Sequence, residues 1–462
     1  MLVKCTTASR HLYFQGLHPE PSLDHRLRSA LLRRLGLRFE PSWKAAVKAT
    51  LLIRNIGQLA TPAGTDAVRG SSMDRLTVIK DAAIAIDLER IVWVGPEADL
   101  PPIDDPAPNE IDALGRTVVP GFVDSHTHFV FGGYRDEEFL WRAEGVPYME
   151  IHERGGGIAT SVNATRAASV DELMALAGNR LARMLELGVT TVEGKSGYGL
   201  DLETELRQLA VMSRLSSLQP VDIVPTYLGA HSIPMEFKGD PSGYVDYMIA
   251  TVLPRVHEQS VARFCDIFCE KGVFELEESR RYLEAAAALG FKLKLHADEL
   301  YRLGGAGLAA ETGAISADHL LKADPVDLVK MANAGVVATC LPLTAFVLRE
   351  PYPDVKAMMT AGCAVALASD LNPGSCYSQS IPLMFAIAVL YMGMSAEAAL
   401  TALTLNGAAA LDLAGDRGSL EPGKLADALI LDAPSYRHLA YHTGMNIVDT
   451  VIKRGKVVSI RS

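Results

Sequence analysis

Residues 118–126 read VVPGFVDSH, a run of apolar and β-branched residues that is followed by a second histidine at position 128. Runs of this kind predict short buried strands, and seven more occur along the chain. They are VTTVEGK (189–195), VDIVPTYLGAH (221–231), ARFCDIFCE (262–270), FKLKLHADE (291–299), GAISADHL (313–320), GVVATCLP (335–342) and CAVALASD (363–370). Segments between them, such as DELMALAGNRLARMLELG (171–188), have apolar residues at helical spacing and end at glycine. Eight alternating β and α units predict a parallel (β/α)8 barrel, the TIM-barrel fold, over residues 119–414.

The sequence segments before and after the barrel are predicted to form short strands. Before it the sequence contains ATLLIRNI (49–56), AAIAIDLERIVWVG (82–95) and NEIDALGRTVV (109–119), and after it GSLEPGKLADALILD (418–432) and VDTVIKRGKVVSI (448–460). Apolar alternation with turn residues between the runs predicts β-hairpins. We therefore expect one small β-sandwich domain built from both chain ends, residues 46–118 together with 415–462.

The first 45 residues differ from the rest and are assigned to neither domain. Arginines outnumber the acidic residues there, and LRSALLRRLGLRF has the pattern of a basic amphipathic helix. An organelle-targeting segment and an upstream mis-called start both fit this composition. The motif LYFQG also resembles the remnant of a protease-cleavable tag, and the sequence does not choose among the three.

Composition limits the classes of protein to consider. Of 462 residues, 49% are hydrophobic and 21% charged, an ordinary balance for a globular protein with a large core. The net charge is −11, and with no long basic run a nucleic-acid partner is not expected. No apolar stretch reaches the roughly 18–20 residues that span a bilayer, so no membrane partner is expected either. The six cysteines contain no C-x-x-C pair, which suits the reducing cytoplasm.

Five of the twelve histidines fall at the ends of predicted strands, where barrels of this kind place their active sites. They are His126, His128, His231, His296 and His319, and the eighth strand ends with Asp370. His126 and His128 are two residues apart on a strand, so both face the same side. With His296 and Asp370 they form a ligand set suited to one zinc or iron ion that activates a water molecule. His152, His257, His438 and His442 lack this placement and are expected to be ordinary core or surface residues.

Longer motifs add a resemblance to a known family. GFVDSHTHFVFGGYRDEEF, MEIHERGGGIATSVNATR, TTVEGKSGYGLDLETELR, PTYLGAHSIP, HADEL, SADHL, LPLTAFVLRE and SDLNPGS are similar to segments of the imidazolonepropionases of the amidohydrolase superfamily. The similarity extends from about residue 50 to the C-terminus. SGYGLDLETEL and the GGGI run are more particular to that family than the metal ligands are. Gly194 and Cys376 depart from its usual pattern.

The resemblance implies a role for each matching residue. It places one divalent or ferric metal ion, zinc or iron, on His126, His128, His296 and Asp370. Glu299 would take a proton from the metal-bound water, His319 would polarise the ring carbonyl or relay charge, and Asp370 would help to pass the proton to the leaving nitrogen. The substrate's ring and propionate would be held by further matching positions, which are Arg135, Tyr148, Tyr198, His231, Asn372, Gly374 and Ser375.

The chemistry of Arg135 and Glu299 can be weighed without the resemblance, whereas Lys195 is judged from what the superfamily implies. Arg135 lies seven residues after His128, where a planar guanidinium could bind a carboxylate; a solvated surface arginine is the alternative. Glu299 lies just beyond His296, near the expected water, although an acid at a helix N-terminus would look the same. Lys195 could be mistaken for a carboxylated lysine bridging two metals. It lies on the second strand, whereas two-metal members of the superfamily carry that lysine on the fourth, so one metal is expected.

The resemblance implies a hydrolase acting on C–N bonds of cyclic amides, which opens the ring of 4-imidazolone-5-propanoate to give N-formimino-L-glutamate in histidine catabolism. Its partners would be a small substrate that carries a carboxylate and a second copy of the chain in a homodimer. A deaminase or another cyclic amidohydrolase on the same barrel is the alternative within enzymes. A barrel without metal or catalysis, acting in assembly, is the alternative outside them.

Overall fold

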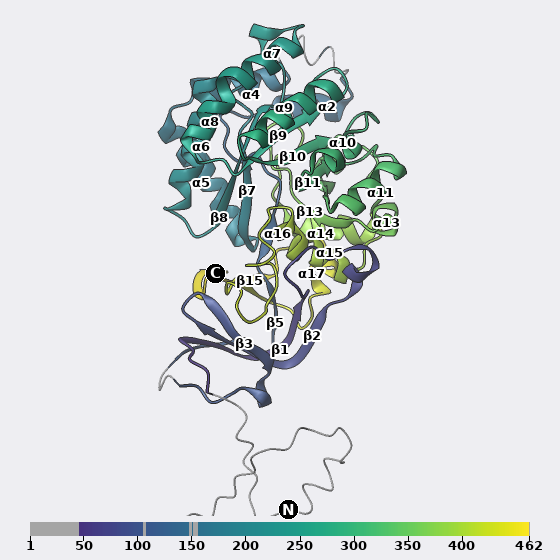
Figure 1. The fold of residues 1–462 in the computed structure, drawn as a ribbon. Coiled ribbons are helices and arrows are strands. Elements are labelled where there is room, and N and C mark those ends of the chain that lie inside the picture. Colours follow the sequence, from purple (N-terminus) through teal and green to yellow (C-terminus); the bar gives the residue numbers. More distant parts are fainter. Residues whose placement is uncertain (1–45, 105–107, 147–149, 151–155, 462) are drawn as a thin grey trace, which may run out of the picture. The chain divides into compact units, whose positions relative to one another are not determined.

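The computed structural model describes residues 46–104, 108–146, 150 and 156–461 (Figure 1). The predicted extension, residues 1–45, lies outside these ranges, as do Tyr148 and His152.

Eight parallel strands form the barrel, and they follow one another in chain order around it. They are β6 (Phe122–Asp124), β7 (Val189–Lys195), β8 (Asp222–Ala230), β9 (Phe264–Cys269), β10 (Lys292–Ala297), β11 (Ser316–His319), β12 (Val337–Cys340) and β13 (Ala364–Leu367). Just beyond the first and last strands, the Asp370 amide donates to the His126 carbonyl at 3.0 Å and the His128 amide to the Leu371 carbonyl at 2.8 Å. These bonds join the two ends of the sheet, and the predicted (β/α)8 barrel is confirmed.

Helices cover the outside of the barrel (Figure 1). Those between its strands are α2 (Asp136–Glu144), α4 (Ile158–Ala167), α5 (Val170–Glu186), α6 (Leu202–Ser216), α7 (Pro241–Tyr247), α8 (Leu253–Gln259), α9 (Leu276–Ala288), α10 (Gly305–Thr312), α11 (Pro325–Ala334), α12 (Pro342–Leu348) and α13 (Val355–Ala361). After β13 come α14 (Ile381–Leu390), α15 (Ala396–Leu403), α16 (Leu405–Ala409) and α17 (His438–Tyr441). Single turns are η1 (Gly70–Asp74), η2 (Glu97–Asp99), η3 (Met235–Phe237) and η4 (Met248–Val252). None of the helices described has the length and apolar character that a bilayer-spanning segment needs.

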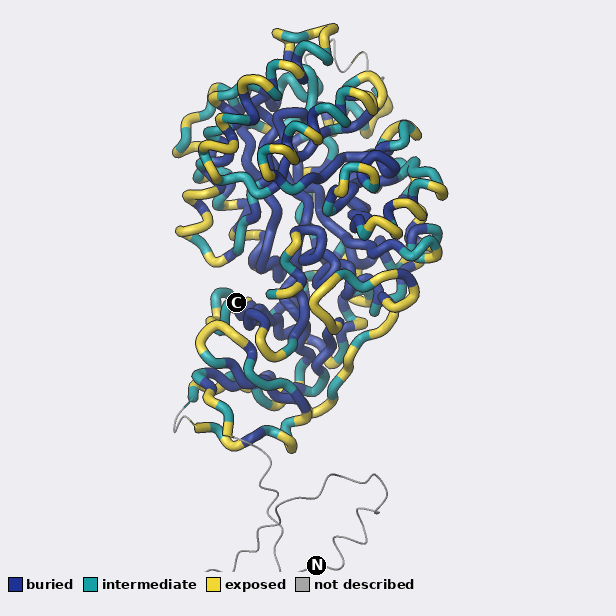
Figure 2. The backbone as a smooth tube through the Cα atoms, viewed as in Figure 1, coloured by how far each residue is buried: buried dark blue, intermediate teal, exposed yellow. Residues whose placement is uncertain are grey.

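Helix α5 shows how the sequence determines where a covering helix begins, which face it buries and where it ends. Ser169 caps it in a capping box with Glu172, which satisfies amides that the first turn leaves without partners. Leu173, Ala177, Leu181 and Met184 recur at helical spacing and are buried against the barrel. The helix ends at Glu186, and two residues later the chain turns at Gly188, whose φ of +91° is readily adopted only by glycine. Figure 2 shows the resulting pattern, with buried strands inside and exposed helix faces outside.

A second sheet of eight strands combines the two chain ends. Its strands are β1 (Leu51–Thr61), β2 (Thr77–Asp87), β3 (Arg90–Pro96), β4 (Asn109–Asp112), β5 (Thr117–Pro120), β14 (Ala428–Leu431), β15 (Val448–Lys453) and β16 (Lys456–Ile460). The order is β16-β15-β14-β5-β1-β2-β3, and β4 pairs with β1. The two ends of the chain meet where β5 and β14 pair antiparallel, with Val118 opposite Ile430. One buried cluster joins Ile53 and Ile84 from one half of the sheet to Ile430 and Ile452 from the other, so both halves face a shared core. The predicted small β domain from both chain ends is confirmed; its boundaries stay a prediction.

Candidate metal centre and active site

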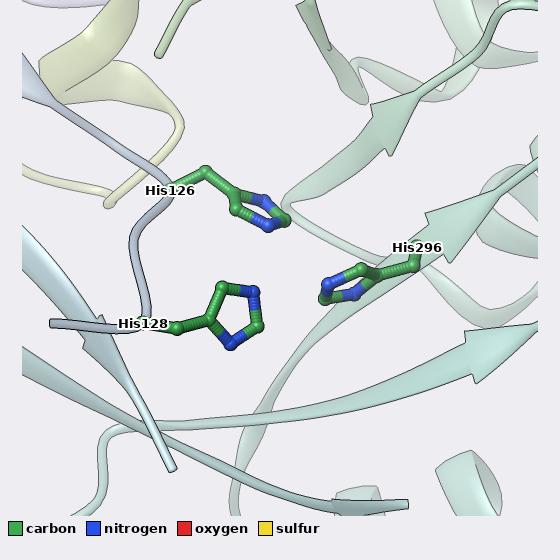
Figure 3. A group of neighbouring side chains, drawn as sticks. All are labelled: His126, His128 and His296. Atoms are coloured by element: carbon green, nitrogen blue, oxygen red, sulfur yellow. The ribbon is translucent and has the colours of Figure 1, made fainter. Parts of the chain in front are cut away.

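Three of the four predicted ligands face one another at the carboxyl ends of the strands. His126 and His128 follow β6 directly, and His296 is the penultimate residue of β10. Their imidazole rings point into a common space (Figure 3), and one nitrogen from each lies within 4.8 Å of the others. All three side chains are buried. The chain thus gathers, from two distant segments, a set of nitrogen atoms that a metal ion could join.

Asp370 brings the fourth predicted ligand to the same place. Its Oδ1 atom lies 3.6 Å from His126 Nε2 and 3.5 Å from His128 Nε2. Its Oδ2 atom accepts a hydrogen bond of 2.6 Å from the Thr344 hydroxyl. Thr344 therefore fixes one carboxylate oxygen and leaves the other toward the histidines.

The side-chain partners of the histidines fit a metal ion. His126 Nδ1 donates to Asp318 Oδ2 at 2.6 Å, and His296 Nδ1 donates to Asp266 Oδ1 at 3.2 Å. These bonds leave both Nε2 atoms buried and, within the described part of the chain, without a partner. Burial also lowers the pKa of His126 and His128 well below the usual value, and the neutral imidazole is the form that binds metals. A carboxylate behind a histidine is the usual support of a metal ligand.

The two predicted proton carriers lie beside this cluster. Glu299 follows β10, and its Oε1 atom is 3.6 Å from Nδ1 of His319, the last residue of β11. Burial, followed by the charges of Asp370 and Glu270, raises the pKa of Glu299 to about 8. Burial likewise raises the pKa of Asp370 to about 6. Carboxylates that give up protons near neutral pH are suited to general acid–base work.

Three strand ends at the site have left-handed backbone at residues other than glycine. The φ angles are +50° at Asp298, +77° at His319 and +52° at Asp370. Such residues cost about 1–3 kcal/mol each and persist where the surrounding structure fixes them. At Asp298 the fixing contacts are visible, because its carboxylate accepts the amides of Leu303 and Gly304, both at 2.8 Å. The three turns with positive φ bring the side chains of Glu299, His319 and Asp370 to the histidine cluster.

Arg135 is held firmly at the edge of the site. Its Nε and Nη2 atoms donate to the two carboxylate oxygens of Glu138 at 2.8 and 2.6 Å. Glu138 is buried and also accepts the Gly157 amide at 2.7 Å. Next to the remaining nitrogen, Nη1, lies Gly374, where a Cβ atom would overlap the guanidinium. The sequence did not predict Glu138, although it lies within the quoted motif GFVDSHTHFVFGGYRDEEF.

Asn372 organises the turn that faces Arg135. Its Oδ1 atom accepts the amides of Gly374 and Ser375, both at 2.8 Å, and its Nδ2 atom donates to the Asp370 carbonyl at 2.8 Å. This is the local bonding by which asparagine stabilises turns. The turn thereby ties the predicted residues Gly374 and Ser375 to the predicted ligand Asp370. Whether the three residues also contact substrate stays a prediction.

Tyr198 and His231 pack beside His128. The His231 ring stacks on His128, with centroids 4.8 Å apart and planes 13° apart, and the Tyr198 ring is 5.2 Å from His231. His231 Nδ1 donates to the Gly197 carbonyl at 3.0 Å. Burial lowers the pKa of His231 to about 3, so the ring is neutral and its Nε2 atom is an acceptor.

A buried carboxylate fixes the loop that carries Tyr198. Glu205, on the inner face of α6, accepts the backbone amides of Gly199 and Leu200 at 2.8 Å and that of Gly197 at 3.0 Å. The sequence did not single out Glu205, although it lies within SGYGLDLETEL. Its only sequence signal was its place in that motif, because a backbone partner leaves no mark on composition or spacing.

We expect Glu205→Gln to loosen this loop. With the amide oxygen in the place of Oε1, the Gly197 amide loses its 3.0 Å bond to Oε2 and keeps only the 3.2 Å bond to Oε1. The acceptor also loses its charge, and a hydrogen bond to a charged group contributes about 1.5–3 kcal/mol. KM should rise and the free energy of unfolding should fall, while metal content stays unchanged. Steady-state kinetics and urea unfolding measure both, with Glu203→Gln on the exposed face of α6 as the control. An unchanged KM in a destabilised variant would show that the loop does not bind substrate.

A barrel with buried histidines at its strand ends, a carboxylate just after the last strand and a second sheet from both chain ends defines the amidohydrolase class. The profile described as the Amidohydrolase family matches residues 275–458. Among solved structures, an adenosine deaminase from Xanthomonas campestris superposes with a TM-score of 0.65 at 18% identity, over 89% of this chain and 93% of that one.

Relatives identified by sequence point to one family within this class. An imidazolonepropionase from Parabacteroides distasonis is 55% identical over 88% of this chain and 98% of its own length. One from Clostridium tetani is 50% identical over 90% of this chain and 99% of its own length. The chain belongs to the imidazolonepropionase family, and the resemblance noted in its motifs is confirmed.

Proposed function

We propose that this enzyme hydrolyses the C–N bond of 4-imidazolone-5-propanoate and releases N-formimino-L-glutamate, a step of histidine catabolism. The observation that carries the proposal is the guanidinium of Arg135, held by Glu138 beside the turn of Asp370 and Gly374. A fixed cation near a metal-binding cluster suits a cyclic amide that carries a carboxylate. The names of the 50–55% identical relatives support the same substrate.

The metal would be held by His126, His128, His296 and Asp370. We propose a single zinc or iron ion; zinc is bound in the similar adenosine deaminase structure. When bound, such an ion lowers the pKa of a coordinated water to about 7 and polarises a carbonyl oxygen. Elemental analysis of the purified protein distinguishes the two metals.

Proton movements would be the work of three side chains. Glu299 takes the proton from the attacking water, and Asp370 helps to deliver it to the ring nitrogen that leaves. His319, whose Nδ1 atom lies 3.6 Å from Glu299, donates toward the carbonyl oxygen as negative charge develops there. The raised pKa of Glu299 supports this role, because a base near neutral pH also returns its proton readily.

The remaining residues would hold the substrate. Arg135 binds the propionate, while Tyr198 and His231 contact the ring from the wall next to His128. Asn372, Gly374 and Ser375 shape the pocket on the other side, and Tyr148, outside the described residues, completes the proposed set.

Incubation with freshly made imidazolone propionate tests the proposal directly. The ring absorbance should disappear while formiminoglutamate appears in equal amount. Release of ammonia without ring opening would favour a deaminase instead. A metal-loaded protein with no turnover of this compound would contradict the proposed substrate.

We also propose that the enzyme works in the cytoplasm as a homodimer. The five described cysteines are free and buried, which supports a reducing compartment. Size-exclusion chromatography with light scattering measures the oligomeric state.

We expect Arg135→Met to lower kcat/KM for imidazolone propionate by about 10–100-fold, because a hydrogen bond to a charged group contributes about 1.5–3 kcal/mol. Metal content should not change. A ring analogue that lacks the carboxylate should be affected little, since it never engages the arginine. Kinetics with both compounds measure the difference.

Gly374→Ala provides an independent disturbance of the same guanidinium. Its Cβ atom would displace Arg135 Nη1 without removing the positive charge, so KM for the charged substrate should rise by less than in Arg135→Met. If both substitutions reduce turnover of the charged and uncharged compounds equally, Arg135 is structural and does not recognise the propionate.

A further inference from the structure

Five charged side chains are completely buried inside the barrel, next to the histidines. This buried ion cluster consists of Glu193, Lys195, Asp266, Lys294 and Asp318, from strands β7, β9, β10 and β11. Three carboxylates face two ammonium groups, so the cluster has one net negative charge. Buried charges persist only when they are paired and hydrogen-bonded, and each of these five has an opposite charge within 3.7 Å.

Lys195 is the member that connects the cluster to the metal site. Its Nζ atom lies 2.6 Å from Asp266 Oδ2, 3.0 Å from Glu193 Oε1 and 3.6 Å from Asp318 Oδ2. Asp266 and Asp318 are the two carboxylates that accept the Nδ1 protons of His296 and His126. One ammonium group therefore touches the supports of two proposed metal ligands from different strands.

We propose that Lys195 is a positioning residue of the metal centre: by its 2.6 Å hydrogen bond to Asp266 it fixes the His296 ring with its Nε2 atom toward the metal. Its charge, 3.6 Å from Asp318, also supports the carboxylate behind His126, a role that it shares with Lys294 at 3.7 Å. This inference rests on one part of the proposed function, the metal site, and does not depend on which substrate the enzyme uses. Outer carboxylates that orient histidine ligands usually change metal affinity about 10–100-fold when they are lost. Lys195 reaches two of them at once.

The same ammonium limits the centre to one metal. His126, Glu193 and Asp318 also present ligand atoms within 4.8 Å of one another, which could suit a second cation. Lys195 lies against both of these carboxylates, and Lys294 lies 3.5 Å from Glu193 Oε2 and 3.7 Å from Asp318 Oδ2. The lysines supply the positive charge that a second ion would bring. Lys195 thus acts as a fixed cation, and not as the carboxylated bridge of two-metal sites.

Lys294 gives a matched control. It is equally buried and belongs to the same cluster, but its closest hydrogen-bond partners are the carbonyls of Ser125 and Ala410, both at 3.3 Å. Within the described part of the chain, Lys294 forms ion pairs with Glu193 and Asp318 and none with Asp266. Lys195→Met and Lys294→Met remove the same charge from the same interior, and only the first releases Asp266.

The experiment compares the affinity for zinc of stripped proteins by competition with a chromophoric chelator. Lys195→Met should bind zinc about 10–100-fold more weakly than the unchanged protein, whereas Lys294→Met should stay close to it. Co²⁺ added in place of zinc should give an altered visible spectrum in Lys195→Met only, because the ligand geometry has changed. Circular dichroism establishes that each protein is folded.

A double variant separates positioning from charge balance. Lys195→Met combined with Glu193→Gln restores the net charge of the cluster, so it should fold even if Lys195→Met does not. It should nevertheless keep the weak zinc affinity and the altered Co²⁺ spectrum, because Asp266 still lacks its lysine. Normal affinity and spectrum in the folded double variant would overturn the inference while leaving the proposed metal site intact. An unchanged protein that holds no zinc would overturn both.

Discussion

His126→Ala is expected to abolish both metal binding and turnover. His126 is one of three buried histidines whose nitrogens lie within 4.8 Å of one another, and its ring lies between Asp318, 2.6 Å from Nδ1, and Asp370, 3.6 Å from Nε2. Without it a first-row metal keeps only part of its ligand set, and the variant would lack the ion that activates water. Elemental analysis should give close to one metal per chain for the unchanged protein and far less for the variant.

His257→Ala is the matched control for this result. His257 is exposed on α8 and packs against Phe291, with ring centroids 6.0 Å apart. Metal content and kcat should both survive that change. A His126→Ala protein that retains its metal would remove His126 from the ligand set, and two tightly held metals per chain would contradict the role of Lys195.

Glu299→Gln should keep the metal but lower kcat by about 10²–10⁴-fold, the usual scale of general acid–base catalysis. The amide has the shape of the carboxylate and cannot accept a proton from water. Because the ligands are untouched, metal per chain should equal that of the unchanged protein, so the two measurements separate proton transfer from metal binding.

Glu311→Gln serves as the control, since this glutamate pairs with Arg280 at the surface. Its kcat should be normal. If Glu299→Gln also retains a near-normal kcat, Glu299 takes no part in the mechanism and Asp370 becomes the principal base.

The barrel could be predicted from the sequence because each buried strand is a short apolar run. In the covering helices, apolar residues recur at the spacing of a helix turn. The candidate ligands could be predicted for a related reason. Two histidines two residues apart at the end of an apolar run predict side chains on the same side, and in the structure both follow β6, which ends at Asp124. The strand ends of a parallel barrel then bring His296 and Asp370 to the same rim without any knowledge of their contacts.

The supports of those ligands could not be predicted in this way. Asp318 is separated from His126 by 192 residues and Asp266 from Lys195 by 71, and nothing local in a strand indicates a partner so far away. Alternation along β11 would also place Asp318 and His319 on opposite faces. The φ of +77° at His319 breaks that alternation, so both side chains reach His126.

The bonds between His126 and Asp370, at the seam where the barrel closes, also set an order of events during protein synthesis. Domains form as their segments leave the ribosome, N-terminal part first. The first two proposed ligands emerge early, but the last belongs to the loop after the eighth strand. The metal centre therefore cannot be complete on a nascent chain until almost the whole barrel has been translated. A chain truncated before Asp370 would lack the last of the four proposed ligands, and only the three histidines would be left to hold the metal.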